Sequence, residues 1–195
     1  MLVLSLLTAP ALAGPVAAQS LAPGFKQPET PLQMVAALPE VAAGWRRGAV
    51  TDFEARPNGA GLGAGAEYRP AAGGPGVATV YRYDRGLAPA VALASLDAEM
   101  DQAMREVELL GPQRRYRVEG RQPAEPVTGP DGRPVLRCEA LVLTFEGGPR
   151  AEGSFCLGLV RGRFLKLRMT LPPGAPGAAA AAVQAFGREI VAVAQ

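Results

Sequence analysis

The stretch from Pro134 to Leu171 constrains the fold of this chain more than any other. In residues 164–171, large apolar side chains alternate with mostly polar ones: Leu165, Leu167, Met169 and Leu171 against Phe164, Lys166, Arg168 and Thr170. Alternation with a period of two is typical of a β-strand with one buried face. Residues 135–145 and 153–160 have a similar β-character, so we expect a three-stranded antiparallel meander.

The connection between the last two strands predicts how they pair. Arg161-Gly162-Arg163 is typical of a three-residue hairpin loop, in which the glycine adopts a positive φ. This loop would gather all the large apolar side chains on one face by three pairings: Leu159 with Leu165, Leu157 with Leu167, and Phe155 with Met169. A slip of one residue would turn one strand's apolar set to the opposite face, so we expect the register to be strongly specified.

The chain has two cysteines, Cys138 and Cys156, which have the same parity on neighbouring predicted strands. An exported protein would favour a disulfide between them. A symmetric hairpin, however, places Cys156 opposite Val142, and a bridge then needs a bulge or an offset loop to bring the Cα atoms close enough. We expect the disulfide; the alternative is two buried thiols that pack as small apolar residues. A redox-active pair is disfavoured because there is no C-x-x-C motif.

The amino-terminal residues predict export. Residues 1–18 match a signal peptide, because a short apolar core is followed by the small-x-small pattern Val16-Ala17-Ala18. We expect residues 19–37 to be a flexible leader and residues 38–195 to be a single domain, located in the periplasm or secreted. No other stretch approaches the roughly 18 apolar residues of a membrane span.

The remaining pattern predicts the fold class. Three strands at 46–55, 61–69 and 77–83 would form a second meander, and apolar residues at three- and four-residue spacing predict helices at 91–110 and 178–194. Between them we expect a short strand at 115–119 and a loop at 123–133. The predicted class is α+β: an antiparallel sheet of two meanders packed with two main α-helices.

Composition excludes several kinds of active site. The chain has no histidine, which removes Ser-His-Asp catalysis, histidine metal sites and histidine pH switches. The net charge of +2, with both signs interspersed, does not indicate a nucleic-acid partner. A hydrolase would have to use residues that stand in no recognisable motif: Ser95, Ser154, Asp84 and Glu139. We expect no enzyme activity, no metal and no cofactor.

Glycines at alternate positions 61, 63 and 65 invite comparison with a dinucleotide-binding loop. That loop needs a strand before it and a helix directly after it, whereas Glu67-Tyr68-Arg69 continues as a strand and ends at Pro70. We interpret the glycines as one face of a strand that another element covers closely.

Three segments resemble a group of exported proteobacterial proteins of unknown function: residues 38–47, 78–86 and 164–170, with sequences LPEVAAGWRR, ATVYRYDRG and FLKLRMT. The resemblance covers most of the mature chain, but its motifs are strands, so it implies no catalytic residue. The predicted architecture is also similar to the PsbP-like fold of extrinsic subunits that bind other proteins. Fold similarity alone does not give function.

Two hypotheses of function follow. The first is a non-enzymatic binding module that contacts a protein or another component of the cell envelope through a basic surface: Arg161, Arg163, Lys166 and Arg168. The second is a carrier of a small apolar ligand or lipid, with a cleft near Trp45, Tyr81 and Tyr83. For Trp45 itself we expect a role as a packing anchor, and ligand stacking is the alternative. The sequence does not predict the oligomeric state.

Overall fold

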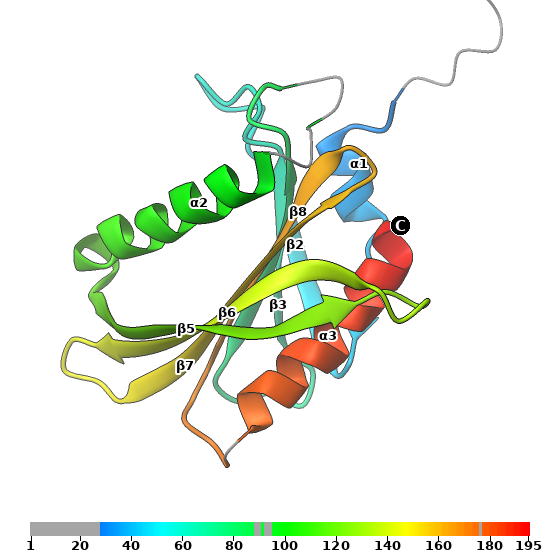
Figure 1. The fold of residues 1–195 in the computed structure, drawn as a ribbon. Helices are drawn as coiled ribbons and strands as arrows, with labels where there is room; N and C mark the ends of the chain where they lie inside the picture. Colours follow the sequence, from blue (N-terminus) through cyan, green and yellow to red (C-terminus); the bar gives the residue numbers. More distant parts are fainter. Residues whose placement is uncertain (1–27, 88–90, 92–94, 176) are drawn as a thin grey trace, which may run out of the picture.

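The computed structural model describes residues 28–87, 91, 95–175 and 177–195. This part of the chain forms eight strands: β1 (Val41–Ala42), β2 (Trp45–Asp52), β3 (Ala64–Pro70), β4 (Val77–Tyr83), β5 (Tyr116–Thr128), β6 (Pro134–Phe145), β7 (Arg150–Val160) and β8 (Arg163–Leu171). They make one antiparallel sheet in the order β1-β2-β3-β4-β8-β7-β6-β5. The sheet is strongly twisted and curls along its length (Figure 1).

Helices cover both faces of the sheet. In the described residues these are α1 (Pro31–Ala36), α2 (Leu96–Leu110), α3 (Ala178–Ala194) and the one-turn 3₁₀ helix η2 (Pro112–Arg114). Helix α2 lies on one side of the sheet, and α1 and α3 lie on the other (Figure 1). We call these sides the α2 face and the α3 face.

The expected α+β class was wrong. The two predicted meanders join through β4 and β8, which pair over seven residue pairs, from Val77 opposite Thr170 to Tyr83 opposite Phe164. The molecule is therefore dominated by one continuous eight-stranded sheet, with small helices on its faces. Sequence patterns show hairpins between neighbouring strands, whereas the β4–β8 pair joins strands separated by about half of the chain.

The register of β7 and β8 also differs from the expectation. The connection is a two-residue turn, Arg161-Gly162, in which both residues have positive φ, 48° and 69°, as a type I′ hairpin requires. Leu159 consequently lies opposite Phe164, and Gly158 lies opposite Leu165. The prediction was wrong by one residue because it assumed one buried face. Both faces are covered, so the apolar residues of β7 and β8 serve opposite cores.

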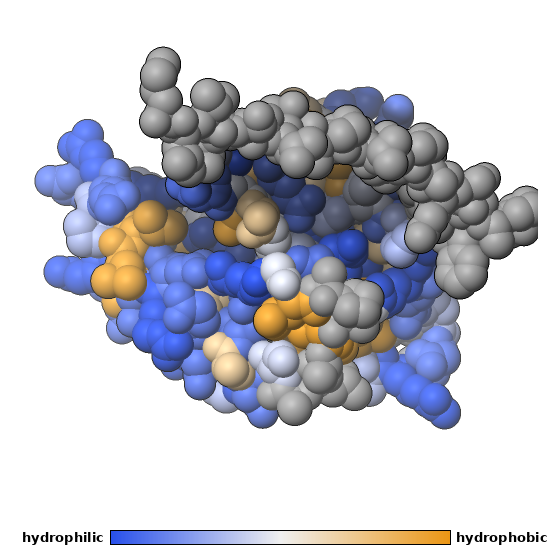
Figure 2. Space-filling view, turned by 90° about the horizontal axis from the view of Figure 1, so that it is seen from above, coloured by the Kyte–Doolittle hydropathy of each residue, from blue (hydrophilic) through white to orange (hydrophobic). Residues whose placement is uncertain are grey.

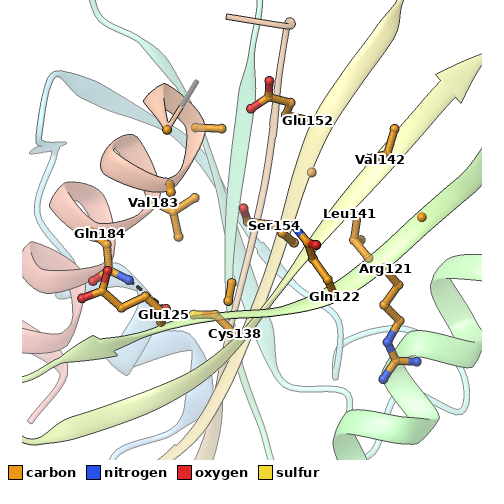
Figure 3. Close-up of a pocket in the computed structure, with 17 residues that line it drawn as sticks. Arg121, Gln122, Glu125, Cys138, Leu141, Val142, Glu152, Ser154, Val183 and Gln184 are labelled. Carbon is orange, nitrogen blue, oxygen red and sulfur yellow. Dashed lines mark hydrogen bonds between the residues drawn. The ribbon is translucent and has the colours of Figure 1, made fainter. Parts of the chain in front are cut away.

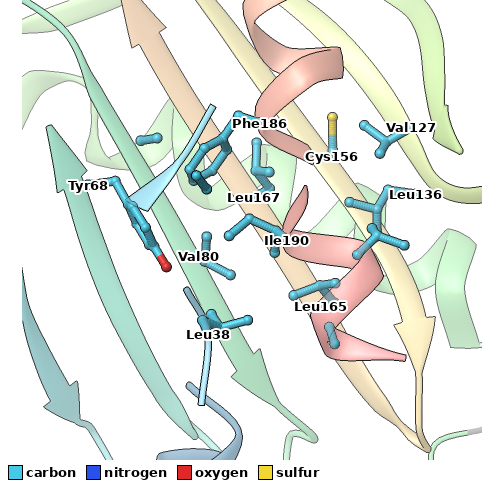
Figure 4. Packing of buried hydrophobic residues seen from close by; sticks show 14 of the residues in the cluster. Leu38, Tyr68, Val80, Val127, Leu136, Cys156, Leu165, Leu167, Phe186 and Ile190 are labelled. Carbon is cyan, nitrogen blue, oxygen red and sulfur yellow. The ribbon is translucent and has the colours of Figure 1, made fainter. Parts of the chain in front are cut away.

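Two cores result, one on each face. On the α3 face, Phe186 and Ile190 of α3 pack with Leu165 and Leu167 of β8 (Figure 4). Trp45 belongs to this core, with its ring centroid 6.1 Å from that of Phe186. On the α2 face, the second core combines one side of α2 with inward residues of β6, β7 and β8: Met100, Met104, Val107, Leu143, Phe155, Leu157 and Phe164.

The disulfide is confirmed, and the register argument against it was wrong. Cys138 and Cys156 are bonded and lie directly opposite each other on β6 and β7, with their Cα atoms 4.1 Å apart. The hairpin closes with Thr144 opposite Arg150, which places Glu152 across from Val142. The offset that a bridge required is therefore supplied by the β6–β7 loop itself.

Strand β5 replaces part of a predicted loop. It runs for 13 residues, although Pro123 and Pro126 fall within it. Proline lacks the N–H that a central strand must donate, but it is tolerated at a sheet edge, and β5 is the last strand of the sheet. The register shifts twice near Val127, which is typical of β-bulges at an edge.

The end of the predicted leader belongs to the fold. Thr30 caps α1 with a capping box, and Val35 of α1 is fully buried. The guanidinium of Arg47 donates hydrogen bonds to the carbonyl oxygens of Val35, Ala36 and Leu38. These bonds satisfy carbonyls that a helix end leaves without partners. The predicted signal peptide lies outside the described residues.

Candidate binding groove

A groove with a volume of about 540 Å³ lies between the first turns of α3 and strands β5, β6 and β7 (Figure 3). We call it the α3 groove. Much of its lining is glycine and small side chains, among them Gly120, Ala124, Ala140, Ser154, Ala179 and Ala180. Five larger polar or charged side chains also line it: Arg121, Gln122, Glu125, Glu152 and Gln184. A volume of this size and a predominantly small, apolar lining are typical of sites for small molecules.

The sequence of α3 explains why the groove is not filled. The helix begins with five alanines, residues 178–182, and its larger apolar residues Val183, Phe186 and Ile190 come afterwards. Alanine is the strongest helix former, so the first turns are stable without large side chains. The carboxyl-terminal half of α3 packs tightly on the sheet, whereas the methyl groups of the first half leave space above β6 and β7.

The sheet side of the groove is equally short of bulk. Ala140 lies opposite Ser154 in the β6–β7 pair. The disulfide joins the next residue pair on the same face, Cys138 and Cys156. Cys138 itself lines the groove. The disulfide thus fixes the two strands that form the floor, and the floor should keep its shape whether or not a ligand is present.

Polar groups are confined to a few positions around this lining. Gln184 donates a hydrogen bond from Nε2 to the carbonyl oxygen of Glu125, 2.9 Å away, which ties α3 to the edge strand β5. Its Oε1 atom is buried and has no hydrogen-bond partner among the described residues. Besides Ser154 and Gln184, the groove is lined by Arg121, Gln122, Glu125 and Glu152 (Figure 3). A ligand would therefore meet the Ser154 hydroxyl and several polar or charged side chains in addition to the apolar floor.

The predicted cleft residues do not come together. Trp45 is buried in the α3-face core, whereas Tyr81 and Tyr83 lie on the α2 face, where the amine of Lys166 sits near both rings. A bulge in β2 between Arg47 and Val50 shifts the parity of the strand that carries Trp45. Of the three glycines expected on one strand face, Gly65 is closely covered, because a Cβ there would lie 2.7 Å from the Tyr81 ring. Gly61 and Gly63 precede β3 and have positive φ angles of 78° and 69°, so the prediction of a strand was wrong for them.

The predicted basic surface is divided. Arg161 forms an ion pair with Glu29 at 2.6 Å, and Arg163 pairs with Asp84. Their charges are therefore already partly matched within the chain. Lys166 and Arg168 lie on the α2 face of β8, away from the turn that holds the other two.

A buried charge network anchors α2 beside Lys166. Glu99 is 7 % exposed and accepts a hydrogen bond from the Tyr83 hydroxyl at 2.6 Å and from both Nε and Nη2 of Arg85. Arg85 also pairs with Glu106 at 2.8 Å. Burial and the bond to Glu99 raise the pKa of Tyr83 well above its ordinary value. The network is internally satisfied, which indicates a structural role.

The titration of Lys166 gives a first testable prediction. Burial lowers its pKa to about 8, although the carboxylate of Glu106 opposes the shift, from an ordinary value of 10.5. Between these two pH values the unfolded chain binds more protons than the folded protein, so the free energy of unfolding rises with pH. Below pH 8 Lys166 is charged in both states, and the full cost of burying its charge remains. We expect Lys166→Met to abolish this rise.

The measurement compares the free energies of urea unfolding of the two proteins from neutral pH upward. The difference between them removes the contributions of the titrating groups that both proteins share. The chain has two lysines, Lys26 and Lys166. In carbon-13 NMR of the reductively methylated protein, the dimethylamine signal that Lys166→Met removes identifies Lys166, and we expect that signal to titrate with a pKa of about 8. A pKa near the ordinary value of 10.5 for the same signal would contradict the prediction.

The residues considered for hydrolysis are scattered. Ser154 faces the α3 groove, Glu139 lies on the α2 face in an ion pair with Arg121, and Asp84 pairs with Arg163. Ser95 precedes α2. No group of three metal-ligating side chains occurs among the described residues, and no helix in that part of the chain is long and apolar enough to cross a membrane.

Comparisons with known proteins do not identify a family. No protein-family model matches the chain, and no curated protein matches it. One similar solved structure is a protein of unknown function from Pseudomonas aeruginosa, with 18 % identity and a TM-score of 0.30 over 52 % of this chain. The match spans 63 % of that chain, less than two thirds of its length. A PsbP-like fold is therefore not supported.

One feature of the sequence indicates the groove, although the overall amino-acid composition does not reveal it. A run of five alanines at the start of an amphipathic helix predicts a stretch of helix without packing volume. The groove forms only where this stretch crosses Ala140 and Ser154, which depends on the β6–β7 register and on the placement of α3. Periodicity within each element does not contain that information.

Proposed function

We propose that this protein is an exported, non-enzymatic binding module that holds a small apolar ligand in the α3 groove. The observation that carries the proposal is a groove of about 540 Å³ whose floor is lined by glycine and small apolar side chains. Concave sites of a few hundred Å³ with a mainly apolar lining and a few polar groups are typical of small-molecule binding.

The lining indicates the kind of ligand. Methyl groups from Ala140, Ala179 and Val183 would contact an aliphatic or aromatic body, and burial of such a body contributes about 25 cal/mol per Å². The hydroxyl of Ser154, which can donate and accept, would orient one polar end such as a hydroxyl or amide group. The groove is open on one side, so a longer chain has room to extend outward.

Export is supported by two independent features. Residues 1–18 match a signal peptide, and the Cys138–Cys156 disulfide is a bond that persists in oxidising compartments. A binding module for apolar molecules has a clear use outside the cytoplasm, where such molecules must cross water between membranes. An envelope partner that delivers or receives the ligand is compatible with this role.

A groove-filling substitution tests the proposal. Ala140→Leu adds three carbons to the centre of the groove floor and should weaken binding of the uncharged probe N-phenyl-1-naphthylamine about tenfold, since roughly 1.5 kcal/mol of apolar contact is displaced. Probe fluorescence, titrated against the mature protein, provides the measurement.

The matched control is Ala98→Leu, which adds the same side chain to an exposed alanine of α2 and should leave probe affinity unchanged. Equal affinity in the wild type and in Ala140→Leu, with both proteins folded by circular dichroism, would refute the α3 groove as the binding site. Mass spectrometry of the purified wild type would then show whether an apolar molecule accompanies the protein at all.

A further inference from the structure

A second hollow lies on the α2 face, beyond the end of α2. Its volume is about 340 Å³, and it crosses β3, β4, β8 and the end of β6. We call it the α2 hollow. Two arginines from distant parts of the chain converge on it: Arg114 in η2 and Arg168 in β8. The threonine side chains of Thr79 and Thr170 lie on the same floor.

These two arginines differ from the other basic residues around the hollow. Arg69 also lines it, but this guanidinium is paired with Glu67 at 2.8 Å. Within the described part of the chain, neither Arg114 nor Arg168 has a carboxylate oxygen within 4.0 Å, although ten other arginines do. Arg168 is only partly exposed, so solvent compensates its charge less than that of a surface arginine.

One carboxylate, that of Glu67, lines the hollow, and it is paired with Arg69. The guanidinium groups of Arg114 and Arg168 therefore leave the lining with more positive than negative charge. Lys166, two residues before Arg168 on the same face of β8, adds to this charge, and the charge of Arg168 helps to lower the pKa of Lys166, although Glu106 and Glu99 oppose that shift. An anion between the guanidinium groups would balance this charge and would receive charge-assisted hydrogen bonds, which are about twice as strong as neutral ones.

We infer that the α2 hollow binds an oxyanion, a carboxylate or phosphate group, carried by a small molecule with an aromatic or apolar body. The guanidinium groups of Arg114 and Arg168 contact the oxyanion, and the threonine hydroxyls donate to its remaining oxygens. Aromatic side chains at both ends of the hollow, Tyr81 on β4 and Phe145 on β6, pack against the body of the ligand. This site is separate from the α3 groove, because the sheet lies between them.

Three probes with the same ring test this inference by isothermal titration calorimetry: phenyl phosphate, benzoate and phenol. We expect at least one of the two anions to bind and the neutral phenol to bind at least about tenfold more weakly, as the loss of a charge-assisted hydrogen bond predicts. A preference for phenyl phosphate assigns the site to phosphate, and a preference for benzoate assigns it to carboxylate.

Substitutions then locate the site. Arg168→Gln and Arg114→Gln should each weaken anion binding about tenfold, and Arg168→Lys, which keeps the charge but loses the planar fork, should have an intermediate effect. Arg188→Gln is the matched control, because Arg188 is exposed on α3 on the opposite side of the sheet. Ala140→Leu should leave anion binding unchanged.

Three results would overturn the inference. The first is that neither anion binds up to its solubility limit. The second is that phenol binds as tightly as the anions. The third is that Arg188→Gln weakens binding as much as Arg168→Gln, which would show general attraction to a basic protein instead of a site.

Discussion

Replacement of both cysteines by alanine should lower the free energy of unfolding by about 3 kcal/mol, the value expected for a cross-link that closes a loop of this length. The bonded residues are separated by 18 positions in sequence and lie directly opposite each other in the sheet. The native backbone therefore needs no displacement to form the bond, and the benefit comes mainly from restricting the unfolded chain. Urea unfolding under oxidising conditions measures the difference.

A reducing agent provides the control. Reduced wild-type protein should have nearly the same free energy of unfolding as the double variant, because both then lack the cross-link. The bond also fixes the floor of the α3 groove, so the double variant should bind the apolar probe more weakly at temperatures where it is still folded. A variant within 0.5 kcal/mol of the oxidised wild type, the usual range for surface substitutions, would contradict the assigned role of the disulfide.

Arg82→Met should stabilise the protein by about 1–3 kcal/mol, in contrast to most substitutions of buried residues. Arg82 is 1 % exposed on β4, and its Nε and Nη1 atoms have no hydrogen-bond partner among the described residues. Burial lowers the pKa of Arg82 to about 10, with Arg161 and Arg163 acting in the same direction. The side chain therefore remains a cation at neutral pH, and its desolvation is compensated poorly.

The hydrogen bond that Arg82→Met removes contributes less to the free energy of unfolding than removal of the buried charge adds. Nη2 of Arg82 donates to the carbonyl oxygen of Val160 at 2.8 Å, and a net contribution of about 1 kcal/mol disappears with that bond. Arg105→Met, on the exposed side of α2, serves as the control and should change stability by less than about 0.5 kcal/mol. Urea unfolding measures both variants. If Arg82→Met lowers the free energy of unfolding by more than Arg105→Met does, the buried guanidinium is stabilising and the prediction is wrong.

The accuracy of the sequence predictions follows the strength of each local pattern. Strand β4 matches the predicted residues 77–83, and α3 matches the predicted helix at 178–194. Both have an uninterrupted periodicity between clear glycine or proline boundaries. The long strand β5 was mostly missed, because prolines that argue against a central strand are acceptable at an edge.

Relations between elements were predicted less well, for a physical reason. The β7–β8 register was inferred from the assumption that one face is buried, and the placement of α2 and α3 on opposite faces removes that assumption. The β4–β8 pair has no local signal. Both candidate sites depend on these relations: the α3 groove needs α3 above Ala140, and the α2 hollow needs Arg114 beside Arg168.

The outcome for the predicted functional residues follows from the same relations. Lys166 and Arg168 were correctly expected to share a polar face, since they belong to one strand. Arg161 and Arg163 were grouped with them by proximity in sequence, but each pairs with a carboxylate from a distant segment. Ser154 was considered as a hydrolase candidate, and its place in the α3 groove depends on the register of β7 against its neighbouring strands.

Photolabelling with an uncharged apolar diazirine probe, followed by peptide mass spectrometry, tests the central proposal most directly. We predict that covalent labels concentrate on the first turns of α3 and on β6 and β7 near Ala140 and Ser154, and that Ala140→Leu removes most of this labelling. Labels that fall evenly over the surface, or that collect on the α2 face and persist in Ala140→Leu, would contradict the assignment of the α3 groove as the ligand site.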